Sequence, residues 1–285
     1  MQQSGGTAGA EAARSGRVLA LSSQVAFGHV GLSAAVPVLQ RLGVAVTPLP
    51  TVMLSNHPGW PHVAAHRVPV EDLRGMVEGL ARNGWLARHD TVLTGYLPSA
   101  AHVELAAWVI DRLRKDVPDL RVVVDPVLGD SPKGLYIDAA AAAAIRTELL
   151  PRADIVTPNL YELGWLTGLY TETVRCTAEA AQGLGCRAMI TSVPVSDGSI
   201  GVLEVGPEAG DAAGTLVETA RLDGVPHGVG DVFSALIASG CTLREAMGHL
   251  SALIAASLGA DHLRIVESAP DWAAAAPVPP KSCAR

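Results

Sequence analysis

The sequence predicts an α/β fold: a single three-layer α/β/α domain whose central sheet is mainly parallel and ends in antiparallel edge strands. Short runs rich in β-branched residues alternate with longer helix-like segments, which is the pattern of parallel strands joined by crossover helices. Beyond Ser192 this alternation stops, and two strand-like runs follow one another with a Gly/Pro/Ala-rich loop between them. That change of pattern predicts the antiparallel edge.

Each element is placed by its own residue pattern. Strands are expected at Val18–Leu21, Val44–Thr47, Thr91–Thr94, Arg121–Val124, Asp154–Thr157, Ala188–Thr191, Ile200–Val205 and Leu216–Leu222. Helices are expected near residues 30–42, 70–83, 100–115, 138–149, 159–168, 173–184, 231–240 and 242–259. In such a sheet, ligands bind beyond the carboxyl ends of the parallel strands. Polar residues at those ends are therefore candidates for a site.

Composition limits the class of protein. The 285 residues are 49 % apolar and 17 % charged, which is typical of a globular protein with a large core. A formal net charge of −7 and the lack of a Lys/Arg stripe argue against a nucleic-acid partner. No apolar run reaches the roughly 18 residues of a membrane span. We therefore expect no membrane partner. The cysteines form no CxxC pair, so we expect a reduced, cytoplasmic compartment.

We expect one folded domain, over residues 17–272. Residues 1–16 are small and polar and lack the apolar stretch of a secretory signal, so they predict a disordered N-terminal extension. Residues 273–285 are rich in Ala and Pro and predict a flexible C-terminal tail. No internal repeat and no linker divides the segment between them.

The most informative run is Gly228-Val229-Gly230-Asp231, which stands directly before a helix-like segment. The free N–H groups and the dipole at a helix N-terminus bind anions. Glycine at 228 and 230 would permit close backbone approach. The Asp231 carboxylate could take a proton from a substrate hydroxyl beside that anion. The same run also fits a tight turn in which Asp231 satisfies helix N–H groups, so both interpretations stay open here.

Polar residues follow several other expected strands. Asp125 stands at the end of one strand, Asn159 and Glu162 begin the helix after the next, and Thr191-Ser192 close the strand after that. Carboxylate and amide oxygens can hold Mg²⁺ directly or through water. Asn159 and Glu162 equally fit a capping box, and Asp125 an Asx turn. The convergence of these residues on one rim of the sheet favours a shared site.

In their order along the chain, these segments resemble the pyridoxal kinases of the ribokinase-like superfamily, from about Arg17 to Leu263. The matching segments are Ser23 with Gly28-His29-Val30-Gly31, then 51–57, 94–96, 125–130, 157–162 and 228–231. The resemblance implies ATP-dependent phosphorylation of the 5′-hydroxyl of pyridoxal, and usually of pyridoxine and pyridoxamine, to give pyridoxal 5′-phosphate in vitamin B6 salvage. It also implies Mg²⁺, often a monovalent cation, and commonly a homodimer.

The resemblance assigns a role to each matched residue. Asp231 would be the catalytic base, and the N–H groups of Gly228, Val229 and Gly230 would form the anion hole. The implied substrate-binding residues are Ser23, Val52, His57, Pro58, Gly59, Tyr96 and Asp231. The implied ATP-binding residues are Asp125, Thr157, Asn159, Glu162, Thr191, Ser192, Gly228 and Gly230. Of these, Asp125, Asn159 and Glu162 would hold the metal ion. The segment 130–136 fits either a flap over ATP or an ordinary surface loop.

Several positions depart from the pattern of the family. Many members have Gln-Phe where this chain has Met53-Leu54, so the flat face that Phe gives the pyridine ring is missing. Pro58 stands in place of a polar residue and Gly164 in place of an acid, and Thr191-Ser192 matches only those members that lack a Lys there. Residues 206–214, which should help to cover the adenine, are Gly/Ala-rich. We therefore expect weaker pyridoxal binding or a shifted acceptor.

Other functions remain for comparison. A related kinase acting on hydroxymethylpyrimidine or another small alcohol is disfavoured by the Gly-His and Ser-Asn-His segments. A non-catalytic pyridoxal-binding protein would need no base at a helix N-terminus. A Rossmann dehydrogenase is disfavoured because no G-x-G-x-x-G follows the first strand. His29 fits either a ligand contact or a helix-start residue, and the remaining histidines outside the motif are expected at the surface or in packing: His62, His66, His89, His102, His249 and His262.

Overall fold

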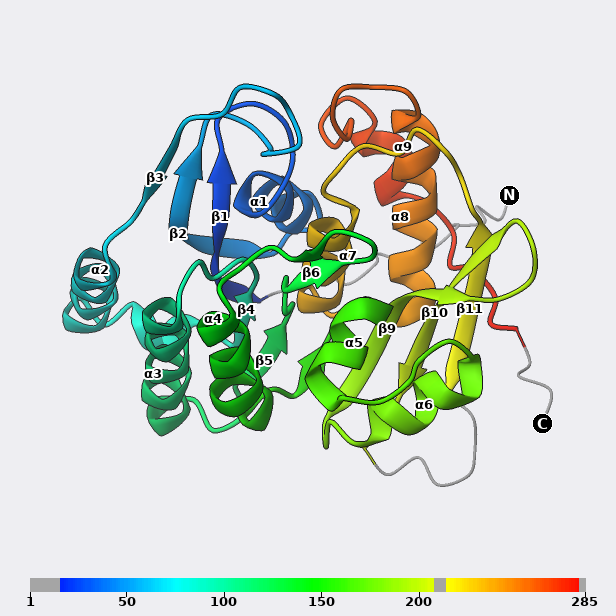
Figure 1. The fold of residues 1–285 in the computed structure, drawn as a ribbon. Helices are drawn as coiled ribbons and strands as arrows, with labels where there is room; N and C mark the ends of the chain where they lie inside the picture. The colour runs from blue at the N-terminus through cyan, green and yellow to red at the C-terminus, as the bar shows by residue number, and fades with distance from the viewer. Residues whose placement is uncertain (1–15, 208–213, 282–285) are drawn as a thin grey trace, which may run out of the picture.

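The computed structural model describes residues 16–207 and 214–281 (Figure 1). Its main sheet has nine strands in the order β11-β10-β9-β8-β5-β4-β1-β2-β3. Their bounds are β1 Arg17–Val25, β2 Ala45–Leu54, β3 Ala65–Arg67, β4 Thr91–Thr94, β5 Arg121–Val124, β8 Ile155–Val156, β9 Arg187–Pro194, β10 Ser199–Val205 and β11 Thr215–Ala220. The central strands pair in parallel, and β3, β10 and β11 are antiparallel. The predicted sheet is confirmed, with β3 as a further edge strand.

Helices cover both faces of this sheet (Figure 1). One face carries α2 (Val70–Arg82), α3 (Ala100–Asp116), α4 (Ala139–Ala144), α5 (Leu160–Thr167) and α6 (Val174–Gln182). The other face carries α1 (Leu32–Arg41), α7 (Val229–Ala238), α8 (Leu243–Ser257) and α9 (Ala269–Ala273). The three predicted layers are thus confirmed. In the part of the chain that the structure describes, no helix combines the length and apolar character needed to cross a membrane.

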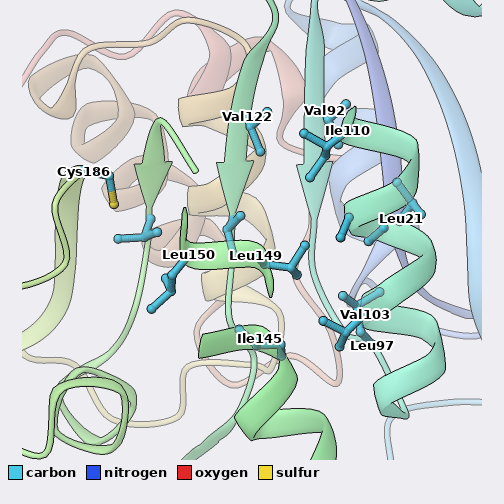
Figure 2. Close-up of a cluster of buried hydrophobic side chains, with 14 of the residues drawn as sticks. Leu21, Val92, Leu97, Val103, Ile110, Val122, Ile145, Leu149, Leu150 and Cys186 are labelled. Carbon is cyan, nitrogen blue, oxygen red and sulfur yellow. The ribbon is translucent and has the colours of Figure 1, made fainter. Parts of the chain in front are cut away.

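Alternate side chains of each strand enter different halves of the core. Leu19 and Leu21 of β1 belong to the cluster beneath α2–α6, whereas Val18 and Ala20 belong to the cluster beneath α1 and α7–α9. Figure 2 shows the first cluster, with Leu21 among the sheet residues that face α3. This two-residue period is the geometry of an extended strand. Because both faces are apolar, the parallel strands read as continuous hydrophobic runs.

Several element ends differ from those expected. β1 continues to Val25, so Ser22 and Ser23 lie inside the strand, at a register shift against β2. β2 runs on to Leu54 because it keeps pairing with β1. The expected helix over 138–149 ends as an α-helix at residue 144 and continues as a π turn and a 3₁₀ turn to residue 152. α7 begins at Val229, so Asp231 lies within its first turn.

The segment after α9, which the sequence predicted to be flexible, packs along the domain. The N–H of Val278 donates to the carbonyl of Arg244 (3.0 Å), and the N–H of Lys281 donates to the carbonyl of Leu216 on β11 (2.9 Å). Lys281 also forms an ion pair with Glu218. The prediction of a flexible tail was wrong for these residues because backbone hydrogen bonds, which the composition does not indicate, hold the segment in place. Of the expected N-terminal extension over 1–16, residues 1–15 lie outside the described residues, as do residues 282–285.

Trp272, in the α9 helix that precedes this segment, gives a test of the packing there. Its side chain is 1 % exposed, and its indole N–H donates to the carbonyl of Ile265 (2.8 Å). We expect Trp272→Ala to lower the free energy of unfolding by about 3–5 kcal/mol through cavity formation and the unpaired carbonyl. Trp85, which is exposed, is the matched control, and Trp85→Ala should cost less than about 0.5 kcal/mol. Urea unfolding checks both, and equal losses would contradict the packing described.

Candidate active site

The start of α7 is shaped by one glycine that the fold requires. Gly228 precedes the helix with φ 104°, in the left-handed region. A Cβ on Gly228 would lie 2.0 Å from the carbonyl oxygen of His29, so only glycine lets the two backbones approach. At Gly230 a Cβ would meet nothing within 4 Å. Gly230 leaves open space at the helix N-terminus, and its expected role in admitting a close approach of phosphate stays a prediction.

Asp231 faces a pocket at the carboxyl ends of β1 and β4. Its carboxyl group accepts hydrogen bonds from the N–H of Gly31 and from its own N–H, while burial raises its pKa to about 6. A carboxyl group with such a pKa can exchange a proton near neutral pH. The polar residues that line this pocket with Asp231 are Ser22, Thr94, Asp125 and Ser234. The pocket thus brings Asp231, in the first turn of α7, together with Asp125 at the end of β5.

Asp125 is tied to the helix that carries Asp231. Ser234, one turn after Asp231 on α7, donates its hydroxyl hydrogen to Oδ2 of Asp125 (2.6 Å). The same hydroxyl oxygen lies 2.9 Å from Oγ1 of Thr157 and 2.9 Å from the carbonyl oxygen of Gly230. All these side chains are buried or nearly so. A chain of hydroxyl groups therefore fixes the position of the Asp125 carboxylate relative to α7.

The backbone beyond Asp125 is held in an uncommon conformation. The N–H of Val127 donates to the Asp125 carboxylate, which is the Asx turn that the sequence allowed. Val127 has φ 44°, which is rare for a β-branched residue and costs about 1–3 kcal/mol. The next two N–H groups, of Leu128 and Gly129, both donate to Oε1 of Glu162 (2.7 and 3.4 Å). These hydrogen bonds keep the strained loop in place.

Asn159 and Glu162 form the capping box at the start of α5. The Asn159 side chain accepts from the N–H of Glu162 (2.9 Å), and Oε2 of Glu162 accepts from the N–H of Asn159 (2.9 Å). The Asn159 amide also donates to the carbonyl of Gly129 (2.9 Å). Both side chains thus position the loop after β5. The capping interpretation is confirmed, and the role in metal binding that the family resemblance implies stays a prediction.

Three carboxyl groups lie out of water around this loop and repel one another. Burial, followed by the charges of Glu162 and Asp231, raises the pKa of Asp125 well above its usual range. Burial likewise raises the pKa of Glu162 to about 7, although the backbone N–H groups of its partners oppose this. Among residues 16–207 and 214–281, no cluster of three or more His, Cys, Asp or Glu side chains is arranged to hold a metal ion by itself.

The expected acceptor residues Ser23, Val52 and Tyr96 come from neighbouring strands. Ser23 pairs with Val52 in the β1–β2 register. Tyr96 follows β4, and its N–H donates to the hydroxyl of Ser22 (3.0 Å) while its carbonyl accepts from the hydroxyl of Thr51 (2.7 Å). These hydrogen bonds fix Tyr96 beside the two strands. The structure therefore brings the three residues together at one end of the sheet.

His57, Pro58 and Gly59 lie on the loop between β2 and β3, and His57 lines a second pocket. His57 stacks on His227, which begins the glycine motif but received no role of its own from the sequence. Trp60 lies in the same loop. The residues that line this pocket are Phe27, Gly28, His29, Val30, His57, Trp60, His227, Asp261 and His262. His262, expected at the surface or in packing, therefore belongs to the pocket.

Ser234 was missed by the sequence analysis, and Thr94 was matched within the segment 94–96 but given no role. Thr94 is fully buried, and its hydroxyl has no hydrogen-bond partner although it borders the pocket of Asp231. Such a group is available to a ligand or a water molecule. The spacing of Ser234, three residues after Asp231 on one helix face, was the signal that could have indicated it. The residues around Thr94 in the sequence do not indicate that its hydroxyl is unpaired.

Thr191 and Ser192 lie inside β9, which runs past its expected end at Thr191 to Pro194. The N–H of Thr191 donates to the carbonyl of Pro158 (2.9 Å), so Thr191 and Ser192 lie next to the start of α5. Ser192 has φ 62°, another left-handed residue that is not glycine. The expected flap is a hairpin of β6 (Gly129–Asp130) and β7 (Gly134–Leu135). Of the segment 206–214, residues 208–213 lie outside the described part.

The fold and the residues at the carboxyl ends of its central strands are those of a small-molecule kinase. Residues 28–257 match the family model described as phosphomethylpyrimidine kinase, and the chain belongs to this family. Within it, the chain is 40 % identical to a pyridoxine/pyridoxal/pyridoxamine kinase of Bordetella bronchiseptica, over 77 % of this chain and 79 % of that protein. It is 34 % identical to a pyridoxal kinase of Leifsonia xyli subsp. xyli, over 88 % and 94 % of the two chains.

Solved structures show the same relationship. A pyridoxal kinase from Leishmania donovani in complex with ADP superposes with a TM-score of 0.85 and 29 % identity, covering 93 % of this chain and 99 % of that chain. The same enzyme in complex with ADP and pyridoxamine gives a TM-score of 0.83. The resemblance to pyridoxal kinases that the sequence motifs carried is thereby confirmed.

The raised pKa of Asp231 predicts a pH-dependent cost to stability. Because the pKa is about 6 in the fold against 3.8 for an ordinary Asp, the unfolded chain loses this proton first as the pH rises. Stability therefore falls between about pH 4 and 6, by up to about 3 kcal/mol. We expect Asp231→Asn to unfold at a higher temperature than the parent at pH 8 and at a similar one at pH 4. Asp119→Asn, at an exposed turn, is the control, and an equal gain there would contradict the prediction.

Proposed function

We propose that this chain is an ATP-dependent kinase that phosphorylates the 5′-hydroxyl of pyridoxal, and also of pyridoxine and pyridoxamine, to give pyridoxal 5′-phosphate and the corresponding phosphates. The observation that carries the proposal is the buried Asp231 carboxyl group, with a pKa of about 6, in the first turn of α7 and in one pocket with Asp125. The named relatives and the ADP complexes of similar structures support it.

The chemistry needs a base and a site for the moving charge. The Asp231 carboxylate accepts the proton of the 5′-hydroxyl while that oxygen bonds to the γ-phosphorus of ATP. The bond from this phosphorus to the bridging oxygen breaks, and ADP leaves. The N–H groups of Val229 and Gly230, at the positive end of α7, stabilise the charge on the transferring phosphoryl group. The open space at Gly230 admits a close approach to them.

The acceptor would lie between the first two strands and the loop after β2. Ser23 offers a hydroxyl to the pyridine ring, Val52 and Tyr96 supply apolar walls, and His57 lies at the polar edge. Pro58 and Gly59 continue that loop. The register of β1 and β2 and the hydrogen bonds of Tyr96 support this arrangement.

The donor side fits a magnesium nucleotide. Asp125, Asn159 and Glu162 are hard oxygen donors, and the mutual repulsion of the buried carboxyl groups would be relieved by a divalent cation. Both oxygens of Glu162 already accept backbone N–H groups, so contact through water suits Mg²⁺, which keeps much of its hydration. When bound, Mg²⁺ supplies neutralisation of phosphate charge. Thr157, Thr191 and Ser192 line the proposed phosphate side.

The cellular setting of the enzyme is proposed from its thiols and from the family resemblance. Cys176 and Cys186 are thiols outside any disulfide, which supports the proposed cytoplasmic location. The homodimer and the monovalent cation are proposed from the family resemblance. We propose one kinase domain over residues 17–272. The segment 274–281 packs against it.

A coupled assay of ADP release tests the proposal. With ATP, Mg²⁺ and pyridoxal, we expect the parent to turn over and Asp231→Asn to lose about 10³-fold or more in kcat, because no other group replaces the base. Direct pyridoxal binding should change by less than about threefold, because Asn keeps the shape of the side chain. Turnover only with hydroxymethylpyrimidine would assign the related kinase instead. No turnover with any alcohol, together with intact vitamer binding, would indicate a binding protein.

The pKa of Asp231 also predicts the acidic limit of activity. The base works only when ionised, so kcat/KM for pyridoxal should fall tenfold per pH unit below about pH 6. Pyridoxine, whose ring titrates differently from that of pyridoxal, is the control that separates the enzyme from the substrate. An acidic limb that moved with the substrate, or activity that stayed constant down to pH 5, would exclude Asp231 as the titrating base.

A further inference from the structure

His227 is the last residue before the glycine-rich start of α7, and its imidazole stacks on that of His57. The ring centroids lie 3.8 Å apart, and the ring planes are 20° from parallel. His57 belongs to the loop between β2 and β3. The stack therefore joins the loop of the proposed acceptor site to the N-terminus of α7, where the proposed base and anion hole lie.

Gly59 shows how closely the two rings are held. A Cβ at Gly59 would lie 2.9 Å from Nδ1 of His57 and 3.1 Å from Nε2 of His227, so both rings pack against its backbone. The N–H of Gly59 donates to Nδ1 of His57 (3.0 Å). Since Nδ1 is the acceptor, the neutral ring carries its proton on Nε2. His57 thus presents a single donor, in a direction that the stack fixes.

The surroundings keep this pair uncharged. Burial, then His227, then Lys133 lower the pKa of His57 to about 4. Burial and Lys133 also lower the pKa of His227, against a smaller opposing effect of Asp130. Lys133 and Asp130 both come from the hairpin of β6 and β7. At neutral pH the pair therefore offers an N–H donor without a positive charge of its own.

The pocket beside the stack is suited to a flat ring. Phe27 and Trp60 border it together with the imidazoles of His29 and His262, whereas the last residue of β2 is Leu54 and not an aromatic residue. His262 lies edge-on to His29, with ring centroids 5.0 Å apart, and edge-on to Phe27, with centroids 5.5 Å apart. Asp261 also lines the pocket, although the charges that act on His57 are those of His227 and Lys133.

We propose that His227 is a positioning residue that sets the acceptor preference of this enzyme: stacked on His57, it holds the Nε2–H of that ring as a fixed donor and favours vitamers with an oxygen opposite it. This proposal rests on the proposed function. Pyridoxal, pyridoxine and pyridoxamine differ only in the group at ring carbon 4, which is an aldehyde, a hydroxymethyl or an aminomethyl cation.

The donor discriminates among these groups by hydrogen bonding. An aldehyde or hydroxyl oxygen accepts the Nε2–H of His57. An ammonium group has no lone pair and leaves that donor unpaired, which costs affinity. The positive charge of Lys133 near both rings acts in the same direction. The preference therefore depends on the orientation and the neutrality of His57, which the stacked His227 supports together with burial and the N–H of Gly59.

The test compares vitamers across substitutions at position 227. His227 is exposed, so its replacement should leave the fold intact. In the parent we expect kcat/KM for pyridoxal to exceed that for pyridoxamine by about tenfold. His227→Ala should raise the KM for pyridoxal about tenfold with little change in kcat, and should bring the ratio near one. His227→Phe, which restores a stacked ring, should stay within about threefold of the parent. His66→Ala, at an exposed site on β3, is the control.

The outcomes separate this proposal from the proposed function. An unchanged vitamer ratio in His227→Ala, an equal loss in His227→Phe, or a loss in kcat alone would overturn the role of His227. If the parent released no ADP with any vitamer, the proposed function would fail. Equilibrium binding of pyridoxal and pyridoxamine to the parent and to His227→Ala, without nucleotide, would then still decide whether the stack sets the preference.

Discussion

The carboxyl groups of Asp125, Glu162 and Asp231 are kept out of water at the carboxyl ends of the central strands, and much of the surrounding structure serves to hold them there. Isolated buried carboxylates are costly, so each is surrounded by donors. Glu162 accepts three backbone N–H groups. Asp231 accepts N–H groups from two segments, and Asp125 accepts from Ser234 and Val127. The remaining repulsion among them is what a cation and a phosphate-bearing substrate would relieve.

These donors also connect parts of the chain that lie far apart in the sequence. Ser234 brings α7 to the end of β5, and Glu162 brings the start of α5 to the loop that leads into the hairpin of β6 and β7. Gly228 lets the start of α7 approach His29, which lies between β1 and α1. A displacement of any one segment would therefore move a carboxyl group relative to the helix N-terminus. Precision of this kind is what phosphoryl transfer demands of a protein.

The repeated apolar strands and their polar ends were enough to predict the layers, the parallel sheet and the convergence of Asp125 and Asp231. Asn159 and Glu162 were predicted as a pair because a capping box depends on residues three apart. What escaped prediction depends on contacts between distant segments. The stack of His227 on His57, the unpaired hydroxyl of Thr94 and the strained φ of Val127 leave no local pattern. The packed segment after α9 was missed for the same reason, since its hydrogen bonds go to Arg244 and Leu216.

The segment after α9 covers part of an edge of the sheet that could otherwise pair with a second copy of the chain. β11 is the outermost strand on its side of the sheet, and an uncovered strand of this sort can recruit an extended peptide from another chain. The pairing of Lys281 with Leu216 occupies backbone groups at the beginning of β11, and the lysine charge stands beside Glu218. The carboxyl-terminal stretch thus acts as a shield, which makes strand-by-strand assembly through this side of the protein unfavourable.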